Sequence, residues 1–323
     1  MGARDPAGTG GGSRRPAWGW RGMGKGRSVP RRARWVASAQ RPKPFSNMAR
    51  LRRSLEEIHI RSWDGYQRVL SERGLDGWAF RGQANEQWPL YSSLSRYLRE
   101  FGIHPEAWVK QEERIIRIFR RKAHHFISPL PAADDGFEWL ALMQHHGAPT
   151  RLLDFTWSPY VAAFFALERA TSHAAVWLIH PPRVLEAADA ILEKAGIATN
   201  DSRTWTPGSF ERCYLPNRHR FVSVGEAFRM NRRLIAQSGT FATPGVLDAP
   251  MEEIVPRDAI LKVRLDTARV RDAAMRDLYL MNMTHATLFP DLDGMARSLA
   301  YELETHWAYD PRTLKSRIDP DSH

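Results

Sequence analysis

The segment of residues 144–159 constrains the fold of this chain more than any other part of its sequence. It carries many polar side chains between two stretches with the apolar spacing of helices, which is rare in a protein core. Gly147 is placed to end the first helix, and Pro149 forces an extended connection. Ser158 and Pro159 combine a capping side chain with a proline at the first helical position. The segment therefore predicts two helices joined by an extended connection, with polar groups gathered as in a site.

A second polar motif, Phe80-Arg81-Gly82-Gln83, precedes this segment in the chain. Residues 77–81 have the composition of a short strand. Side chains alternate between the two faces of a strand, so Phe80 and Arg81 should point in opposite directions. We therefore expect Phe80 to anchor the strand in the core while Arg81 reaches into a cleft.

The remaining periodicity predicts an α+β fold. Asp134 or Asp135 can cap the helix that ends near residue 147, and the helix over residues 159–170 is apolar on most of its circumference, so it should be central. Further helices are expected over residues 62–72, 105–126, 184–195, 267–281 and 293–305, and strands over residues 174–179, 219–224, 234–241 and 260–265. Residues 196–218 have a loop-like composition. We expect residues 48–323 to form one α+β domain.

The net charge of +11 is concentrated at the start of the chain. Residues 1–47 hold eleven Lys or Arg and one Asp, whereas the rest of the chain is nearly neutral. Too few apolar groups accompany this charge to offset the entropy of ordering, so we expect residues 1–47 to form a disordered basic tail. The tail is either an arm that binds nucleic acid or an anionic membrane non-specifically, or a start-site artefact with translation beginning at Met48.

Cysteine content and hydropathy indicate a cytoplasmic protein. The single Cys213 excludes an internal disulfide framework and a zinc site built from several cysteines. No apolar run approaches the ~18 residues that a membrane-spanning helix needs. We therefore expect no membrane span and a location in the reducing cytosol.

The polar residues of the two motifs suit a phosphate-bearing ligand. A guanidinium binds phosphate in a bidentate manner, so Arg81 is a candidate for a nucleotide pyrophosphate, and Gly82 would let the ligand approach the backbone. His145 and His146 can titrate near neutral pH, and Thr156 and Ser158 offer hydroxyls near a helix start. The sequence has no glycine-rich phosphate loop of the Walker or dinucleotide type and no Gly-x-Ser-x-Gly elbow.

Two other interpretations of the same residues remain open. Asp154 and Ser158 would cap the turn and the helix in a purely structural arrangement, with His145 packed inside and Arg151 paired to Asp154. Alternatively, His145, His146 and Asp154 would supply metal ligands. Adjacent helical residues diverge by about 100°, which disfavours both histidines on one ion, so no metal is expected.

These segments, taken together, resemble the FRG-domain family, named for its Phe-Arg-Gly motif. The resemblance extends over residues 60–305 and rests on residues 80–83, 138–140, 144–154, 156, 159, 165–166, 237–241 and 288–294. Family members occur mainly in microbes, so the resemblance implies a bacterial protein. It does not imply a settled activity.

The chain also has a more distant similarity to mono-ADP-ribosyltransferases of the Arg, Ser, Glu type. That similarity implies a mixed or antiparallel β core with surrounding helices and a cleft for NAD. Arg81 is similar to the arginine that holds NAD, and residues 154–158 with the following helix resemble the nicotinamide pocket. Gln237 lies near the position of the acid that orients the ribose, and an amide cannot act as a carboxylate. Glu226 or Glu138 would then have to supply the acid.

The resemblance thus implies a candidate site for NAD, a substrate here, and an unknown acceptor. The candidate catalytic residues are Glu138, His145, Asp154 and Gln237. The candidate ligand-binding residues are Arg81, Gly82, Gln83, Gln144, His146, Thr150, Arg151, Thr156 and Ser158. The expected activity is ADP-ribosyl transfer or NAD cleavage. Two alternatives are a nucleotide sensor or interaction module without turnover, and a metal-dependent nuclease or hydrolase.

Overall fold

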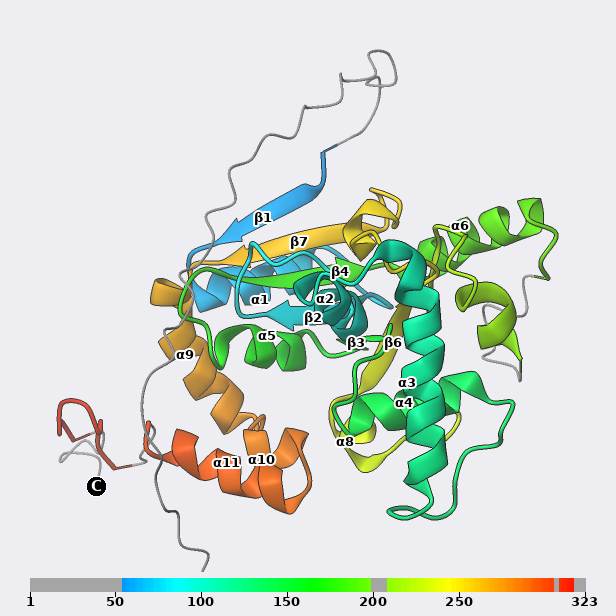
Figure 1. Cartoon of the computed structure of the whole chain (residues 1–323). Coiled ribbons are helices and arrows are strands. Elements are labelled where there is room, and N and C mark those ends of the chain that lie inside the picture. Colours follow the sequence, from blue (N-terminus) through cyan, green and yellow to red (C-terminus); the bar gives the residue numbers. More distant parts are fainter. Residues whose placement is uncertain (1–53, 199–207, 305–307, 317–323) are drawn as a thin grey trace, which may run out of the picture. The chain divides into compact units, whose positions relative to one another are not determined.

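A single seven-stranded sheet organises the chain in the computed structural model, which describes residues 54–198, 208–304 and 308–316 (Figure 1). The strand order is β1-β7-β4-β2-β3-β6-β5. The strands are β1 (Glu56–Ile60), β2 (Ala79–Gln83), β3 (Leu153–Thr156), β4 (Ala174–Ile179), β5 (Val222–Gly225), β6 (Gly239–Pro244) and β7 (Ile260–Leu265). Only β1 and β7 are parallel, and the other neighbours are antiparallel. The expected mixed α/β architecture is confirmed.

Ten α-helices surround this sheet in the described part of the chain. They are α1 (Trp63–Glu72), α2 (Ser93–Glu100), α3 (Trp108–Ala123), α4 (Gly136–His145), α5 (Pro159–Leu167), α6 (Pro181–Lys194), α8 (Arg232–Ala236), α9 (Thr267–Leu280), α10 (His285–Leu288) and α11 (Leu292–Glu302). The chain divides into the units Met1–Arg50 and Leu51–His323, and the predicted tail over residues 1–47 lies outside the described residues. None of the helices in the described ranges has both the length and the apolar character needed to cross a bilayer.

Helices α1, α5 and α9 cover one face of the sheet (Figure 1). Their buried side chains join those of β2, β4 and β7 in one apolar cluster that includes Phe80, Phe164 and Val270. Helix α5 has almost no polar residue after its capping Ser158, because most of its circumference contacts the sheet or another helix. The prediction of a central helix is therefore confirmed, but the helix ends at Leu167 and not at residue 170.

The contact between β2 and α5 is unusually close. A Cβ atom added to Gly82 would lie 2.0 Å from the backbone oxygen of Ala162 and 2.6 Å from the backbone nitrogen of Ala166. Both of those atoms belong to the helix backbone, so they cannot rotate away as a flexible side chain would. The side of Gly82 where a Cβ would point is therefore filled by α5, and the residue must be glycine for the helix to lie against the strand.

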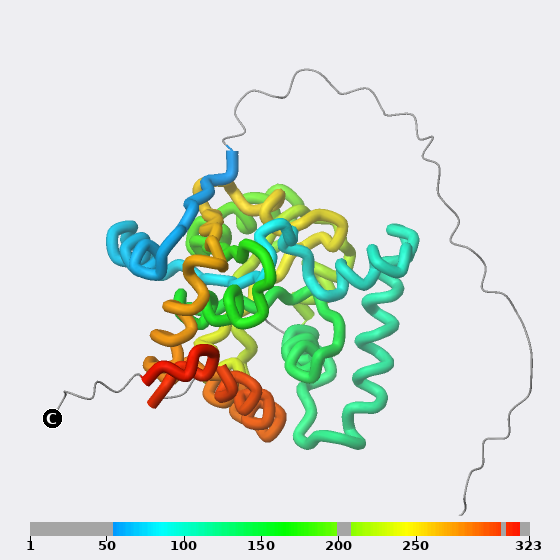
Figure 2. Tube along the Cα trace, turned by 90° about the vertical axis from the view of Figure 1, so that its left-hand side faces the viewer, coloured from blue at the N-terminus to red at the C-terminus, as the bar shows by residue number. Residues whose placement is uncertain are grey.

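Helices α3 and α4 form a second cluster with α6 and residues 210–214. Helices α10 and α11, orange to red, lie beside the end of α9 in both views (Figures 1 and 2). The C-terminal helices therefore approach the same face of the sheet as α5.

Three local expectations were wrong or incomplete. Residues 234–241 do not form one strand, because Asn231 caps the short helix α8 and Ser238 adopts a positive φ of 44° before β6 begins. A π-helix occupies residues 210–214, where a loop was expected. Strand β1 and helix α2 were not predicted. Each is short, and its existence depends on tertiary contacts that local periodicity does not reveal.

The close contact at Gly82 makes a stability prediction. Gly82→Ala should lower the free energy of unfolding by about 3 kcal/mol or more, because the added methyl group overlaps fixed backbone atoms. Gly74→Ala is the matched control: its added Cβ meets nothing within 4 Å, and its positive φ of 55° costs only about 1 kcal/mol. Urea denaturation measures both, and equal losses in the two variants would contradict the steric explanation.

Candidate functional site

A cleft opens where strands β2 and β3 separate. The two strands share a single paired position, Phe80 opposite Thr156, and diverge after it. The resulting cleft has a volume of about 690 Å³. Its walls come from β2 and the loop after it, from β3, and from α2, α5 and α8. The residues directly after α5 and α8 also contribute. The walls comprise Phe80, Arg81, Gly82, Gln83, Ala84, Trp88, Pro89, Tyr91, Arg96, Asp154, Phe155, Thr156, Phe165, Glu168, Arg169, Arg233 and Gln237.

Arg81 bridges the gap between the two strands. Its Nη1 donates a hydrogen bond of 2.6 Å to the backbone oxygen of Asp154. The side chain thereby supplies the donor that a backbone N–H of β2 would supply if the two strands stayed paired. Its Nε is buried and has no hydrogen-bond partner among the described residues. Burial lowers the pKa of Arg81, while the carboxylate of Asp154 raises it and Arg96 lowers it further. The guanidinium thus lies enclosed in the cleft with unused donor capacity.

The charge of the cleft is positive. Arg96, Arg169 and Arg233 join Arg81 in its walls, whereas Asp154 and Glu168 are its only carboxylates among the described residues. Arg96 is exposed and donates to the backbone oxygen of Tyr91 at 2.9 Å. Four guanidinium groups against two carboxylates favour an anionic ligand, and phosphate groups suit their geometry.

Asp154 is held from behind by two of the predicted ligand-binding residues. The hydroxyl of Thr150 donates to Oε1 of Gln144 at 2.6 Å, and Nε2 of Gln144 donates to Oδ2 of Asp154 at 2.9 Å. Thr150 and Gln144 do not line the cleft. Their hydrogen bonds connect the end of α4 to β3 and fix the orientation of the carboxylate.

The hydroxyl of Thr156 and the cap of α5 have structural partners. Thr156 donates to the backbone oxygen of Gln237 at 2.6 Å and accepts from the backbone nitrogen of Ser158 at 3.0 Å. The hydroxyl of Ser158 accepts from the nitrogen of Val161 at 3.3 Å, as a helix cap does. Nε2 of Gln237 donates to the backbone oxygen of Leu288 at 3.0 Å. Thr156 and Gln237 line the cleft, and Ser158 does not.

Three other candidates lie away from the cleft. Glu138 accepts a hydrogen bond of 2.9 Å from the backbone nitrogen of Arg229, and burial raises its pKa. The pKa of His145 is lowered, first by burial and then by the neighbouring His146. His146 lines a different, apolar hollow between α3 and α4. Within residues 54–198, 208–304 and 308–316, no three His, Cys, Asp or Glu side chains gather as metal ligands would.

Arg151, which the sequence placed among the ligand-binding residues, is buried in the protein interior. Its Nε donates to Oε1 of Glu112 at 2.7 Å, its Nη2 pairs with the second oxygen, and its Nη1 donates to the backbone oxygens of Pro244 and Gly245. Both charged side chains are almost completely shielded from solvent. The structure does not bring Arg151 to the cleft, and the alternative pairing of Arg151 with Asp154 is wrong.

The sequence motifs missed much of the cleft. Trp88, Tyr91 and Arg96 come from the segment that includes the unpredicted helix α2, and Arg233 comes from the unpredicted helix α8. Glu168 and Arg169 end the central helix, where two charges are ordinarily read as a solvated terminus. The apolar character of that helix indicates that it lies in the core. This was the only signal in the sequence that could have drawn attention to the charged residues Glu168 and Arg169 at its end.

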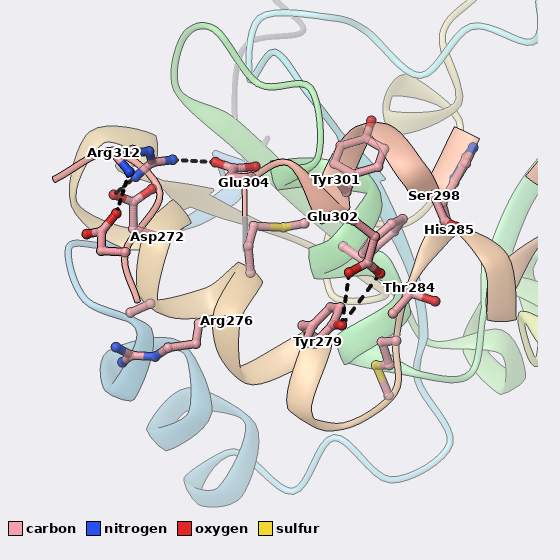
Figure 3. A pocket seen from close by; sticks show the side chains of 15 residues that line it. Asp272, Arg276, Tyr279, Thr284, His285, Ser298, Tyr301, Glu302, Glu304 and Arg312 are labelled. Atoms are coloured by element: carbon pink, nitrogen blue, oxygen red, sulfur yellow. Dashed lines mark hydrogen bonds and ion pairs between the residues drawn. The ribbon is translucent and has the colours of Figure 1, made fainter. Parts of the chain in front are cut away.

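A second hollow of about 270 Å³ lies between α9, α10 and α11 (Figure 3). Its carboxylates are largely paired with neighbours: Glu304 bonds to Arg271 and Arg312, and Glu302 accepts from Tyr279. Both ring nitrogens of His285 in this hollow are without a hydrogen-bond partner among the described residues. The cleft has more than twice the volume of this hollow and contains residues of both sequence motifs, so it is the better candidate for a functional site.

Comparison with protein families identifies the segment that builds much of the cleft. Residues 76–175 match the FRG domain. The chain carries an FRG domain. The match runs from just before β2 to the start of β4, so it includes both strands that separate around the cleft, and it is shorter than the expected resemblance over residues 60–305. Comparison with curated proteins and with solved structures gives no match.

The buried position of Arg151 in the FRG domain gives a stability prediction. Arg151→Met should lower the free energy of unfolding by about 3–5 kcal/mol, because Glu112 is left charged and unpaired in the interior. The double variant Arg151→Met/Glu112→Leu should recover most of that loss. Arg183→Met, which breaks an exposed pair with Asp258, should cost less than about 1 kcal/mol. Chemical denaturation of all three checks this, and a mild effect of Arg151→Met alone would refute the structural role.

Proposed function

We propose that the cleft of this FRG-domain protein binds a phosphate-bearing nucleotide of the NAD type. The observation that carries the proposal is Arg81, an enclosed guanidinium with a free donor and no carboxylate at ion-pair distance within the described residues. The carboxylate of Asp154 acts on this guanidinium without a direct ion pair, so a ligand phosphate could still bind the free donor. The other three arginines would contact the same or a neighbouring phosphate.

The size and the apolar groups of the cleft support a ligand larger than phosphate alone. A volume of about 690 Å³ lies within the range of sites for cofactor-sized molecules. Trp88, whose exposed fraction is 53%, and Tyr91 offer aromatic faces next to the arginines. Aromatic side chains bind nucleobases by stacking. Phosphates on the guanidinium groups and a base on these rings would account for both kinds of residue.

The proposed reaction is cleavage of the bond between nicotinamide and ribose. The electrons of that bond would leave with the nicotinamide ring nitrogen, and water or an acceptor nucleophile would bond to the ribose carbon and lose a proton. Asp154, held by Gln144, would stabilise the positive charge that develops on the ribose. This assignment draws on the distant similarity to ADP-ribosyltransferases, in which Arg81 and residues 154–158 correspond to NAD-binding positions.

A second candidate function is nucleotide recognition without turnover. It is favoured by Gln237, which presents an amide where the similarity calls for an acid, and by the hydroxyl of Thr156, which is already engaged. A cleft of this kind would report the presence of the nucleotide to a partner. The two candidates share the same ligand and differ only in product formation.

Loss of the guanidinium at the base of the cleft should weaken binding. Arg81→Gln should raise the Kd for NAD at least tenfold, because about two charge-assisted hydrogen bonds are lost. Arg183→Gln, at an exposed position outside the cleft, should leave the Kd unchanged. Calorimetric titration of both variants, with thermal melting to confirm folding, measures this. An unchanged Kd in folded Arg81→Gln would refute the proposed phosphate contact.

Nicotinamide release distinguishes turnover from recognition. We expect the wild-type protein to release nicotinamide from NAD, and Asp154→Asn to bind NAD while releasing nicotinamide about 100-fold more slowly. Chromatography of the titrated samples measures the product. Binding by the wild type without release would replace the enzymatic proposal by the recognition function, and absence of binding would refute both.

A further inference from the structure

Glu168 is a largely buried carboxylate in the wall of the arginine-rich cleft. It follows directly after α5, its side chain is only 8% exposed, and it contributes to the cleft wall together with Arg169. Neither of the sequence motifs includes it. A carboxylate at this place opposes the attraction that the four guanidinium groups exert on an anion, so its presence needs an explanation.

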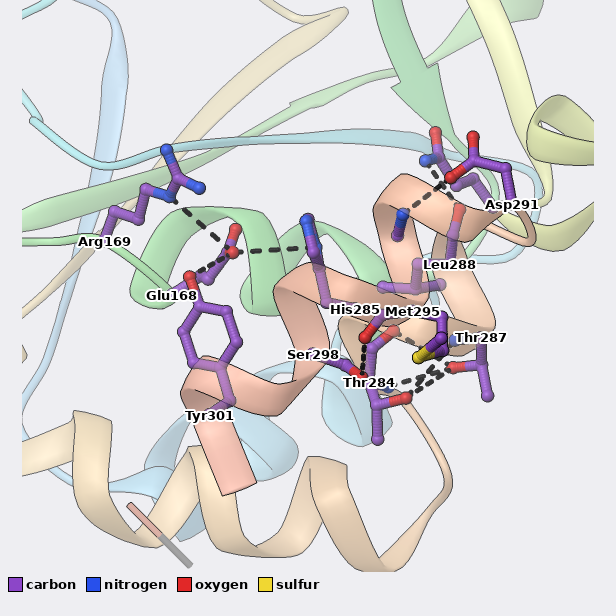
Figure 4. A network of polar contacts seen from close by, with 12 residues as sticks. Glu168, Arg169, Thr284, His285, Thr287, Leu288, Asp291, Met295, Ser298 and Tyr301 are labelled. Carbon is purple, nitrogen blue, oxygen red and sulfur yellow. Dashed lines mark hydrogen bonds and ion pairs between the residues drawn. The ribbon is translucent and has the colours of Figure 1, made fainter. Parts of the chain in front are cut away.

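Three polar contacts of the Glu168 carboxylate all involve the same oxygen (Figure 4). The hydroxyl of Tyr301 donates to Oε1 at 2.5 Å, and Nδ1 of His285 and Nε of Arg169 each lie 3.7 Å from Oε1. No hydrogen bond to Oε2 is found within the described ranges. The hydroxyl of Tyr301 therefore holds one oxygen, with His285 nearby but not hydrogen-bonded to it, and the other oxygen keeps its capacity to accept.

Several hydrogen-bond acceptors in the rest of the cleft are already engaged. Guanidinium groups only donate. Oε1 of Gln83 already accepts from Trp177 at 2.8 Å, and Oδ2 of Asp154 accepts from Gln144. A ligand with only phosphate oxygens would bond to the arginines and be repelled by Glu168. A ligand that also carries a donor, such as a hydroxyl or an amide, would satisfy both.

We propose that Glu168 determines the specificity of the cleft by requiring a hydrogen-bond donor on the ligand beside its phosphates. Its Oε2 accepts from a hydroxyl or amide of the bound nucleotide, and its charge disfavours polyanions without such a group. This inference rests on the proposed nucleotide-binding function and names the residue that separates a nucleotide from phosphate or pyrophosphate.

The competing explanation is structural. The hydrogen bond from Tyr301 ties α11 to the end of α5, and Glu168 would then serve only to anchor that helix. A structural role changes the binding of every ligand in the same direction, because it acts through the shape of the cleft. A specificity role changes two ligands in opposite directions, because it removes a contact from one and a repulsion from the other.

Calorimetric titration of the full chain with NAD and with inorganic pyrophosphate tests the proposal. Glu168→Gln removes the charge and keeps the shape. It should raise the Kd for NAD about tenfold through loss of a charge-assisted hydrogen bond, and lower the Kd for pyrophosphate a few-fold through loss of repulsion. The control is Glu302→Gln. Glu302 also accepts a hydrogen bond from a tyrosine, Tyr279, but it lies outside the cleft, so both Kd values should stay as in the wild type.

Opposite shifts for the two ligands would support the specificity role of Glu168. A second outcome is that the wild type binds NAD while Glu168→Gln weakens the binding of both ligands or leaves both Kd values unchanged. That result would overturn this inference alone and leave the proposed function intact. Failure of the wild-type protein to bind NAD would overturn the proposed function, and this inference with it.

Discussion

The separation of β2 from β3 is the constraint on which the candidate site depends. Two neighbouring strands that part after one paired position leave backbone groups without partners, and such groups are costly unless something else satisfies them. The side chain of Arg81 fills this need by donating to the backbone oxygen of Asp154. The same guanidinium therefore stabilises an opening in the sheet and supplies positive charge to it.

Helix α5 supports this opening from one face of the sheet. Its backbone lies against Gly82, its first turn is capped by Ser158 next to Thr156, and its last turn leads to Glu168 and Arg169. The apolar side chains between those ends hold the helix against the sheet, so the polar groups at its end are placed by the core and not by a mobile loop. Rigid support of this kind is what a precise binding site requires.

The sequence predicted part of the candidate site and missed the residues that lie on short helices. Arg81, Asp154 and Thr156 were predicted from compact motifs, and the structure brings them to one cleft. Arg96 and Arg233 lie on short helices whose formation depends on capping and tertiary packing. Periodicity alone does not detect such helices.

Arg151 shows the reverse case, a residue that the sequence proposed for ligand binding and that the structure places in the interior. It lies in the polar segment that the sequence singled out, yet Glu112, a residue of the distant helix α3, draws it into the interior. A sequence shows which residues are polar, but burial depends on which distant residue offers the matching charge. The distinction between a ligand-binding arginine and a structural one therefore needed the fold.

The match to the FRG domain ends at the start of β4, whereas Arg233 and Gln237 of the cleft come from a later part of the chain. The cleft is thus a composite, with one wall from the shared domain and another from residues that the family does not define. In this chain, Arg81 and Asp154 lie inside the matched segment, whereas Arg233 and Gln237, on the opposite side of the sequence boundary, complete the same cleft.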